Sequence, residues 1–455
     1  MNKLRAFRGL IGVSQKDITP PDGIFARNWG AATHDTADGV HRRLMLTCQT
    51  FRQKTGQDPL VLIGADLGWW KNAGDECLFR QQILQQTGLP EANLMFCLAH
   101  THAGPGLCLD DEAKPGGHLI RPYREELVKK SVAAIGEALA SETQATLTWQ
   151  YGVCDLAANR EYPDPEGDRV LTGYHPSVPA DHTLLVGKIT DRASGATRGI
   201  LVNYACHPTT LAWQNRQISP DFIGAMRELV EASTKSPCLF LQGASGELSP
   251  PIQFTGDTSL ADRYGRQLGY AVLSTLESME APGHVLTYRG VVESGASLAM
   301  WEAIPAEISI EMKTIMIEVE YQLKDFPVYA ELEKEWKNCA DHVLKERLWR
   351  KMCIRKAIGD GQSASVKLWI WQLGSSLLIG QPNEAFSSYQ MQIRRKFPDL
   401  AIAIMNLANG SIGYLPPQDH YQLNTYPVWQ TPFAAGSSDI LRNTTLEAIN
   451  QLLYE

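Results

Sequence analysis

The stretch NLMFCLAHTHAGPG, residues 93–106, decides the fold class and points to the function. Its apolar part, residues 93–98, has the length of a buried strand and ends where polar residues and glycines begin. Further strands of this kind are predicted at 60–66, 184–189, 199–205, 238–242, 367–373, 377–380 and 400–406. Amphipathic helices are predicted at 124–140, 222–233, 260–277, 383–396 and 436–453. The pattern predicts a mixed α/β (α+β) fold with a β-sheet core flanked by helices.

One segment differs from this pattern. Residues 329–357 are highly charged, which is typical of a long surface helix or of a helical insertion, and we place such an insertion at about residues 325–360. The chain shows no internal repeat, low-complexity tract or linker. We therefore expect a single domain over residues 1–455 that carries this insertion.

The composition excludes several classes of function. The 455 residues are 44% hydrophobic and 20% charged, which is typical of a globular protein. A net charge of -8 argues against nucleic acid as a partner. No apolar run approaches the roughly 18 residues of a membrane span, so no integral membrane association is expected. Nine cysteines without a CxxC pair, and no signal-peptide core, indicate a cytoplasmic protein with reduced thiols.

Three histidines follow predicted strands. His100 and His102 come directly after the strand at 93–98, and an extended His-x-His places both imidazoles on one face. His207, in NYACHPTTL (203–211), follows another strand. Singly, each fits an ordinary surface, capping or buried histidine. Because neutral imidazole is the commonest nitrogen ligand of zinc, three convergent histidines favour a metal site.

A fourth segment, FLQGASGELSPP (240–251), leads from a buried strand into a turn that holds Glu247 and Ser249. It only partly matches the GxSxG nucleophile elbow, since Glu247 stands where the final glycine belongs. The segment therefore argues against a serine hydrolase.

Two later segments carry further polar candidates. In IGQPNEAFSSYQMQIRR (379–395), Glu384 is predicted to open a helix, where a carboxylate is also an ordinary partner of the helix dipole. In NLANGSIGYLPPQDHYQLNTYP (406–427), Tyr414 and Tyr426 lie in a loop rich in glycine and proline, where aromatic side chains usually pack.

Taken together and in this order, these segments resemble the catalytic N-terminal domain of the neutral/alkaline non-lysosomal ceramidase family, without its C-terminal immunoglobulin-like domain. The stretches that carry the resemblance are GVSQKDITPP (12–21), DGVHRRLMLTCQTF (38–51), AHTHAGPG (99–106), ACHPTTL (205–211), GELSPP (246–251), PNEAFSSYQMQIRR (382–395) and NGSIGYLPPQDHY (409–421), with an Asn159-Arg160 pair between the histidine motifs.

The resemblance implies a zinc-dependent hydrolase that cleaves an N-acyl amide bond with a metal-activated water. The substrate would be a small-molecule or lipid-like N-acyl compound. The implied Zn²⁺ ligands are His100, His207, Glu384 and Tyr414. The implied catalytic residues are Ser249, acting as nucleophile or as positioning donor, and His102, Arg160 and Tyr426 around the reaction centre.

Other functions fit the same residues. A zinc-dependent lactonase or esterase, or a small-molecule amidase of a specialised pathway, would use the same chemistry. A non-catalytic binding protein on the same fold is a third reading. The sequence departs from the family pattern at Glu247 and Pro251, and it specifies neither the acyl chain, the amine half nor the oligomeric state.

Overall fold

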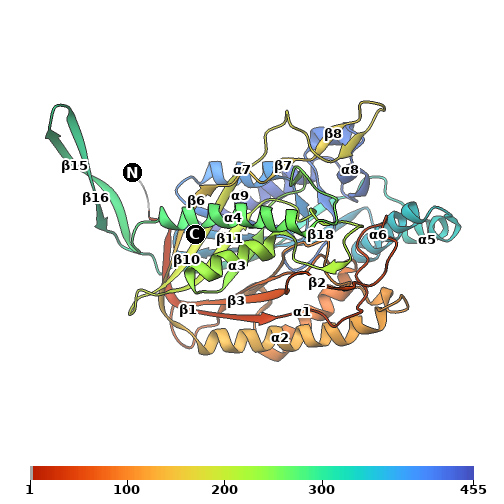
Figure 1. The fold of residues 1–455 in the computed structure, drawn as a ribbon, viewed down its shortest axis with the longest axis horizontal. Helices are drawn as coiled ribbons and strands as arrows, with labels where there is room; N and C mark the ends of the chain where they lie inside the picture. Colours follow the sequence, from red (N-terminus) through yellow and green to blue (C-terminus); the bar gives the residue numbers. More distant parts are fainter. Residues whose placement is uncertain (1–3, 455) are drawn as a thin grey trace.

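The structure is a computed structural model that describes residues 4–454, and it confirms the mixed α/β class (Figure 1). Its largest sheet has eight strands in the order β13-β11-β10-β6-β1-β3-β4-β5. The bounds in chain order are β1 Ala6–Asp17, β3 Met45–Arg52, β4 Leu60–Ala65, β5 Leu94–Leu98, β6 Thr143–Val153, β10 Thr183–Asp191, β11 Thr197–Tyr204 and β13 Cys238–Gln242. The pairs β4–β5 and β11–β13 are parallel, whereas the other neighbours are antiparallel.

A second sheet, which the sequence did not reveal as separate, has four strands in the order β17-β18-β19-β21. These strands span Met312–Gln322, Ser363–Leu373, Ser376–Gly380 and Ala401–Met405. The two sheets pack face to face around an apolar core that includes Leu62, Trp369 and Trp371. The described residues thus share a layered core, and the single-domain boundary stays a prediction.

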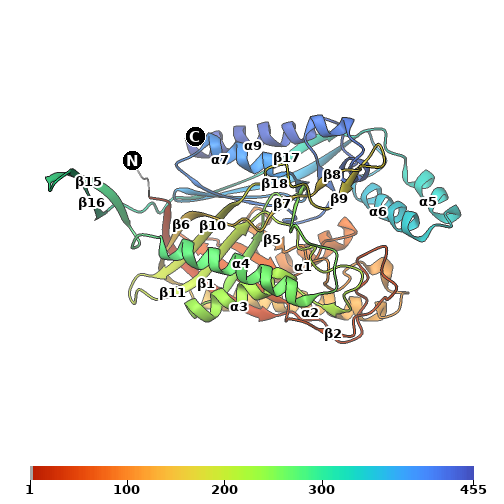
Figure 2. The same ribbon diagram turned by 45° about the horizontal axis from the view of Figure 1, so that its top comes forward.

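Helices cover the outer face of each sheet, which gives four layers (Figure 2). Four helices pack on the large sheet: α1 (Ala73–Thr87), α2 (Ile120–Ala140), α3 (Phe222–Thr234) and α4 (Thr258–Glu277). Helices α7 (Ser387–Lys396) and α9 (Ser437–Tyr454) pack on the small sheet. In β4, Leu60 and Leu62 face the second sheet while Val61 and Ile63 face the helices. Burial on both faces explains why such strands are continuous apolar runs.

The charged segment forms two helices, which agrees with a helical insertion rather than with one long surface helix. Helix α5 spans Tyr329–Asn338 and α6 spans His342–Ile358. Asp341 is the N-cap of α6, because its side chain accepts hydrogen bonds from the backbone N–H groups of Val343 and Leu344. Leu348 and Met352 of α6 are buried against α5 and neighbouring segments. The insertion is therefore packed on one side rather than wholly exposed.

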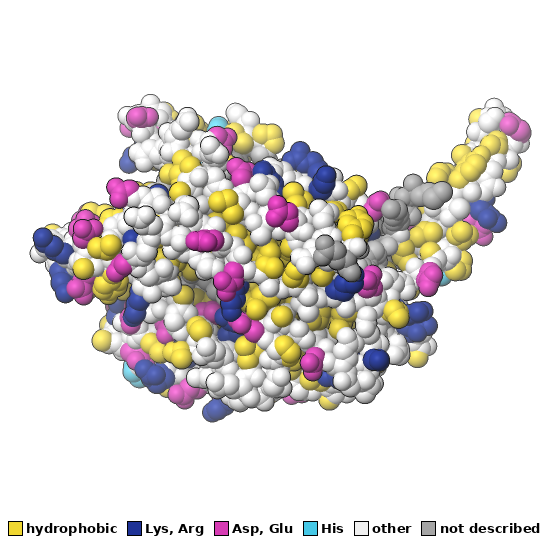
Figure 3. Space-filling model, turned by 180° about the vertical axis from the view of Figure 1, so that it is seen from behind, with side chains coloured by type: hydrophobic (Ala, Val, Ile, Leu, Met, Phe, Trp, Pro, Cys, Tyr) yellow, Lys and Arg dark blue, Asp and Glu magenta, His cyan; other side chains and the backbone are white. Residues whose placement is uncertain are grey.

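A two-stranded ribbon projects from the opposite end of the molecule. Strands β15 (His284–Glu293) and β16 (Ser297–Pro305) pair only with each other and extend away from the layers (Figure 1). Its exposed apolar side chains include Tyr288, Met300 and Trp301, and hydrophobic side chains mark this arm in the view from behind (Figure 3). Within residues 4–454, no helix has both the length and the apolar character that crossing a bilayer requires.

Candidate metal centre

A cavity of about 300 Å³ lies where strands of both sheets end. The parallel pairs β4–β5, β11–β13 and β19–β21 all point their carboxyl ends toward this cavity. The segments that follow these strands supply lining residues such as Trp69, His100 and Thr209. The sheets are also joined there, since the backbone N–H of Asn406 donates to the carbonyl of Gln242 at 3.0 Å. The carboxyl edge of parallel strands is where α/β folds place ligands.

His100 lies two residues beyond β5, but the chain is not extended there. Its φ angle is 71°, in the left-handed region that non-glycine residues seldom adopt. The expected extended His-x-His is therefore wrong, and a turn instead brings the His100 and His102 rings to 4.8 Å between centroids. The Nδ1 of His100 lies 3.3 Å from the carbonyl oxygen of Gly68. A strained backbone at a buried polar residue is typical of functional sites.

His207 follows β11 and is fully buried. Its Nδ1 lies 2.7 Å from the carbonyl oxygen of Ser245 and 3.2 Å from that of Leu248, so Nδ1 carries the proton and donates it. Burial, reinforced by the charge of Arg160, lowers the pKa of His207 to about 3. The imidazole is thus neutral, and its Nε2 presents a lone pair to the cavity side, as in a metal-binding histidine.

Glu384 does not open a helix as the sequence suggested. It lies in the two-residue strand β20 (Glu384–Ala385), and α7 begins only at Ser387. Strand β20 pairs in parallel with β22 (Tyr414–Leu415), which places Glu384 directly opposite Tyr414. A hydrogen-bonded strand pair outcompetes the helix start, and it juxtaposes two residues that lie 30 positions apart.

The nitrogen atoms of two histidines converge on the Glu384 carboxylate. Its Oε2 lies 3.0 Å from Nε2 of His207 and 3.3 Å from Nε2 of His100. Burial opposes ionisation of Glu384, but its contacts with His100 and His207 outweigh this effect and hold the pKa well below its usual range. Both Nδ1 atoms lie against backbone carbonyls, so two Nε2 atoms and a carboxylate oxygen face one another, an arrangement that a cation would stabilise.

The donor set fits a zinc ion. Two ligand atoms that each lie about 2.0 Å from a tetrahedral zinc are separated by about 3.3 Å, close to the observed spacings. Candidate ligand atoms of His100, His102 and His207 all lie within 4.8 Å of one another. The Nε2 atoms of His100 and His102 are buried and have no hydrogen-bond partner among residues 4–454. His102, which we expected beside the metal, is therefore also a candidate ligand.

Arg160, Tyr414 and Tyr426 line the same cavity. The Arg160 guanidinium donates to the Tyr414 hydroxyl at 3.2 Å and to the carbonyl of Gly246 at 2.6 Å. Burial, with the nearby Glu384 carboxylate, raises the pKa of Tyr414 well above its usual value, although Arg160 acts in the opposite direction. The Tyr414 and Tyr426 rings meet edge to face at 5.9 Å. Six of the eight expected residues therefore line this cavity, and a seventh, His207, contacts it through Glu384, whose Oε2 lies 3.0 Å from the His207 Nε2.

Ser249 is the exception. It is fully buried in β14 (Leu248–Ser249) and is absent from the cavity lining. Its Oγ accepts a hydrogen bond from the Gln253 amide at 2.7 Å, and Gln253 in turn accepts one from Thr209, which lines the cavity. Ser249 therefore lies behind the residues that line the cavity and is connected to one of them, Thr209, through Gln253.

Sequence reasoning missed the aromatic residues of the cavity wall. Trp69 follows β4 and packs 4.7 Å from the His102 ring, while Trp29 packs on the other side at 5.1 Å. Trp213 and Phe254 continue this wall. The Trp69-Trp70 pair directly after a strand was the available signal, since residues at strand ends face the sheet edge.

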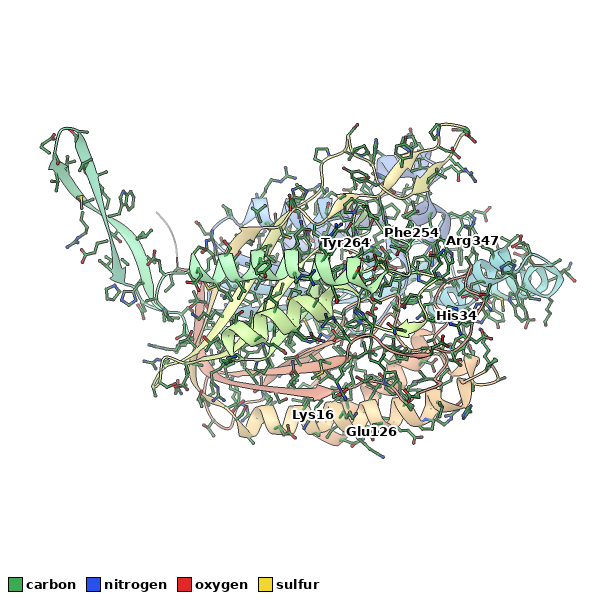
Figure 4. The ribbon with its side chains drawn as sticks, viewed as in Figure 1. Lys16, His34, Glu126, Phe254, Tyr264 and Arg347 are labelled. Atoms are coloured by element: carbon green, nitrogen blue, oxygen red, sulfur yellow. The ribbon has the colours of Figure 1, made fainter. Side chains whose placement is uncertain are left out.

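The insertion supplies the remaining side of the cavity. Val343, Glu346, Arg347, Arg350 and Ile354 of α6 all line it, with the spacing of one helix face. Figure 4 labels Arg347 and Phe254, which come from distant parts of the sequence and lie at the same end of the molecule. No motif marks this face, because its contribution depends on how α6 docks.

Fold and cavity together define a layered α/β protein with a histidine-rich candidate metal centre, and comparisons with known proteins agree. The profile described as neutral/alkaline non-lysosomal ceramidase, N-terminal, matches residues 10–254, more than half of the chain. The chain belongs to this family.

Individual relatives are more distant. A neutral ceramidase from Mycobacterium tuberculosis (strain ATCC 25618 / H37Rv) is 29% identical over 211 residues, which cover 42% of this chain and 31% of that protein. The crystal structure of neutral ceramidase from Pseudomonas aeruginosa superposes with a TM-score of 0.67 at 16% identity, over 98% of this chain and 74% of that one. A ceramidase complexed with C2 gives 0.68 at 16% identity, over 99% and 76%. At such identities, the two solved structures support the fold alone.

Proposed function

We propose that this chain is a zinc-dependent amidohydrolase that cleaves an N-acyl bond, with His100, His207, Glu384 and Tyr414 as the metal ligands. The observation that carries the proposal is the convergence of two buried imidazole Nε2 atoms on one ionised carboxylate oxygen, at 3.0 and 3.3 Å. Without a cation, three electron-rich atoms would face one another in a buried site.

A zinc ion bound there would supply Lewis acidity, polarising a carbonyl and lowering the pKa of water. The overall reaction adds water across the C–N bond and yields a carboxylic acid and an amine. The chain's own residues would orient the substrate and stabilise the developing negative charge.

Three lining residues suit that second task. His102 is neutral, since burial and the neighbouring histidines lower its pKa well below the usual value, so its Nε2 can accept or donate a proton. The buried Arg160 holds the Tyr414 hydroxyl and adds positive charge beside it. The Tyr426 hydroxyl can donate to an oxyanion. Removing one such donor typically lowers the rate on the order of a hundredfold or more.

Ser249 enters the proposal as a positioning residue. Its hydroxyl is engaged by Gln253 and lies behind the cavity wall, which supports positioning over nucleophilic attack. We also retain a cytoplasmic location as a proposal, because all nine cysteines are free.

Metal analysis tests the ligand set. Purified protein should hold about one zinc per chain, and His207→Ala should lose it, because one of only a few ligands disappears. His118→Ala, at an exposed histidine outside the cavity, is the matched control and should retain the metal. The zinc content of Tyr414→Phe and of His102→Ala distinguishes the two candidates for the fourth ligand, because only loss of the true ligand should lower it. Well-folded wild-type protein that takes up no zinc would refute the metal centre.

Hydrolysis tests the reaction. N-acyl amines, esters and lactones assayed side by side should show amide cleavage that chelation abolishes and zinc restores. Cleavage of esters or lactones without amides would move the assignment to a zinc esterase or lactonase. Fluorophosphonate labelling of Ser249 together with chelator-resistant turnover would instead indicate a serine hydrolase.

A further inference from the structure

The charge of the cavity wall is opposite to that of the whole chain. Lining residues include the cations Lys71, Arg160, Arg347 and Arg350 but only two carboxylates, Glu346 and Glu384. The chain as a whole carries a net charge of -8. A bound divalent cation would make the excess of positive charge larger still. Such a cavity attracts an anionic ligand.

Arg350 is the cation best placed to bind that anion. Its guanidinium lies over the Trp69 ring, 5.7 Å from the ring centroid, and the same Trp69 ring packs 4.7 Å from the His102 ring. One indole ring therefore links Arg350 to the candidate metal centre. A further contact, at 3.5 Å, joins Arg350 to the Tyr426 hydroxyl.

Each of the three guanidinium nitrogens has one protein partner, but Nη1 and Nη2 donate only once each and so keep a second N–H. The guanidinium donates to the carbonyl of Asn28 at 2.9 Å, while its ion pair with Glu346, one turn earlier on α6, spans 3.5 Å. By contrast, Arg42 holds Asp262 with two bonds of 2.7 Å. Arg350 thus keeps donor capacity for a planar anion, which the arginine fork binds in a bidentate manner.

The rest of the wall limits what the anion can be attached to. Trp29, Trp69, Trp213 and Phe254 surround the centre, and the cavity volume of about 300 Å³ is at the small end for ligand pockets. Helix α6 adds the apolar side chains of Val343 and Ile354 to the lining. The wall suits a compact apolar or aromatic body.

Resting on the proposed function, we infer that the substrate is a compact amide bearing a carboxylate, of the N-acyl amino acid class, whose carboxylate pairs with Arg350. In such a compound the carboxylate is separated from the amide nitrogen by a single carbon. That short separation keeps the carboxylate near the scissile bond, and Trp69 contacts both the Arg350 guanidinium and the His102 ring. Arg350 then acts as a specificity-determining residue contributed by the insertion.

The test compares N-acetyl amino acids with their neutral carboxamide twins, including N-acetylphenylalanine and N-acetylphenylalaninamide. Wild-type protein should prefer the acid at least tenfold in kcat/KM, because charge-assisted hydrogen bonds give a preference of about 10- to 100-fold. In Arg350→Gln, the ratio of kcat/KM for the acid to kcat/KM for the carboxamide should be close to one. Arg350→Lys should retain part of the preference for the acid. Lys356→Gln removes a charge from α6 outside the cavity and should leave the ratio unchanged.

Binding to metal-free protein provides a readout independent of turnover. Because four tryptophans line the cavity, their fluorescence should report binding of the acids, with Arg350→Gln weakening it at least tenfold. If Arg350 has a purely structural role, Arg350→Gln should weaken the binding of the acid and of its carboxamide twin equally, and this result would overturn the inference. Equal cleavage and binding of every acid and its carboxamide twin by the wild-type protein would also overturn it. Arg350-dependent binding of acids without hydrolysis of any amide would uphold the carboxylate-binding role of Arg350 and refute the proposed function.

Discussion

A single methyl group at Gly246 should disturb the candidate metal centre from behind. Gly246 lies where the GELSPP loop meets β20: its N–H donates to the carbonyl of Ala385 at 3.0 Å, and its own carbonyl accepts from Arg160. A Cβ at this position would lie 2.4 Å from Cδ1 of Phe386 and 3.1 Å from the backbone oxygen of Glu384. The Gly246→Ala substitution therefore places an atom against the strand that carries the proposed carboxylate ligand.

The size of the effect follows from these distances. Carbon atoms in contact require about 3.5 Å, so Phe386 and β20 must move by about 1 Å. Phe386 is only 1% exposed and cannot turn outward. Overpacking of this kind costs about 1–3 kcal/mol of unfolding free energy. A shift of Glu384 by about 1 Å should lower kcat/KM on the order of a hundredfold.

Urea unfolding, zinc content and amide hydrolysis measure the three consequences of Gly246→Ala. Gly136→Ala is the matched control, because a Cβ on this exposed residue of α2 meets nothing within 4 Å. That control should gain about 0.5–1 kcal/mol from the higher helix propensity of alanine. If Gly246→Ala has wild-type stability, metal content and activity, the close approach of the GELSPP loop to β20 is refuted.

Three further substitutions test other parts of the structure. Burial raises the pKa of Glu247 from 4.5 to about 7, although hydrogen bonds from Ser387 act in the opposite direction. The contribution of Glu247 to the free energy of unfolding is therefore largest below pH 4.5 and decreases as the pH rises to about 7. Glu247→Gln should therefore gain about 3 kcal/mol relative to wild type between pH 5 and pH 8 in urea unfolding, and a pH-independent difference would contradict this. Ser249→Ala should retain zinc and lower kcat by about tenfold, since positioning rather than attack is lost; unchanged kcat would remove Ser249 from the site. Asp66→Ala should lower the unfolding free energy by about 3–5 kcal/mol because Arg227 then remains buried and unpaired, and a loss below about 1 kcal/mol would argue against this ion pair.

The sequence by itself determined the strands and the order of the polar motifs. Runs such as residues 60–66 and 238–242 are buried on both faces, so their apolar character marks them locally, and the histidines that follow strands necessarily lie at a sheet edge. His100 and His207 could be chosen as ligands on those grounds together with the family resemblance. Nothing in the separate motifs could establish that their Nε2 atoms meet one carboxylate.

Only the tertiary structure decided the features that depend on distant pairing. Glu384 enters a strand because Tyr414 lies opposite it, and His100 adopts a left-handed φ in a turn where its N–H donates to the carbonyl of Leu67. The charged face of α6 becomes a cavity wall through docking, which helical periodicity alone does not specify. Short-range patterns encode which residues are buried, whereas convergence of separate segments is set by long-range hydrogen bonds and packing.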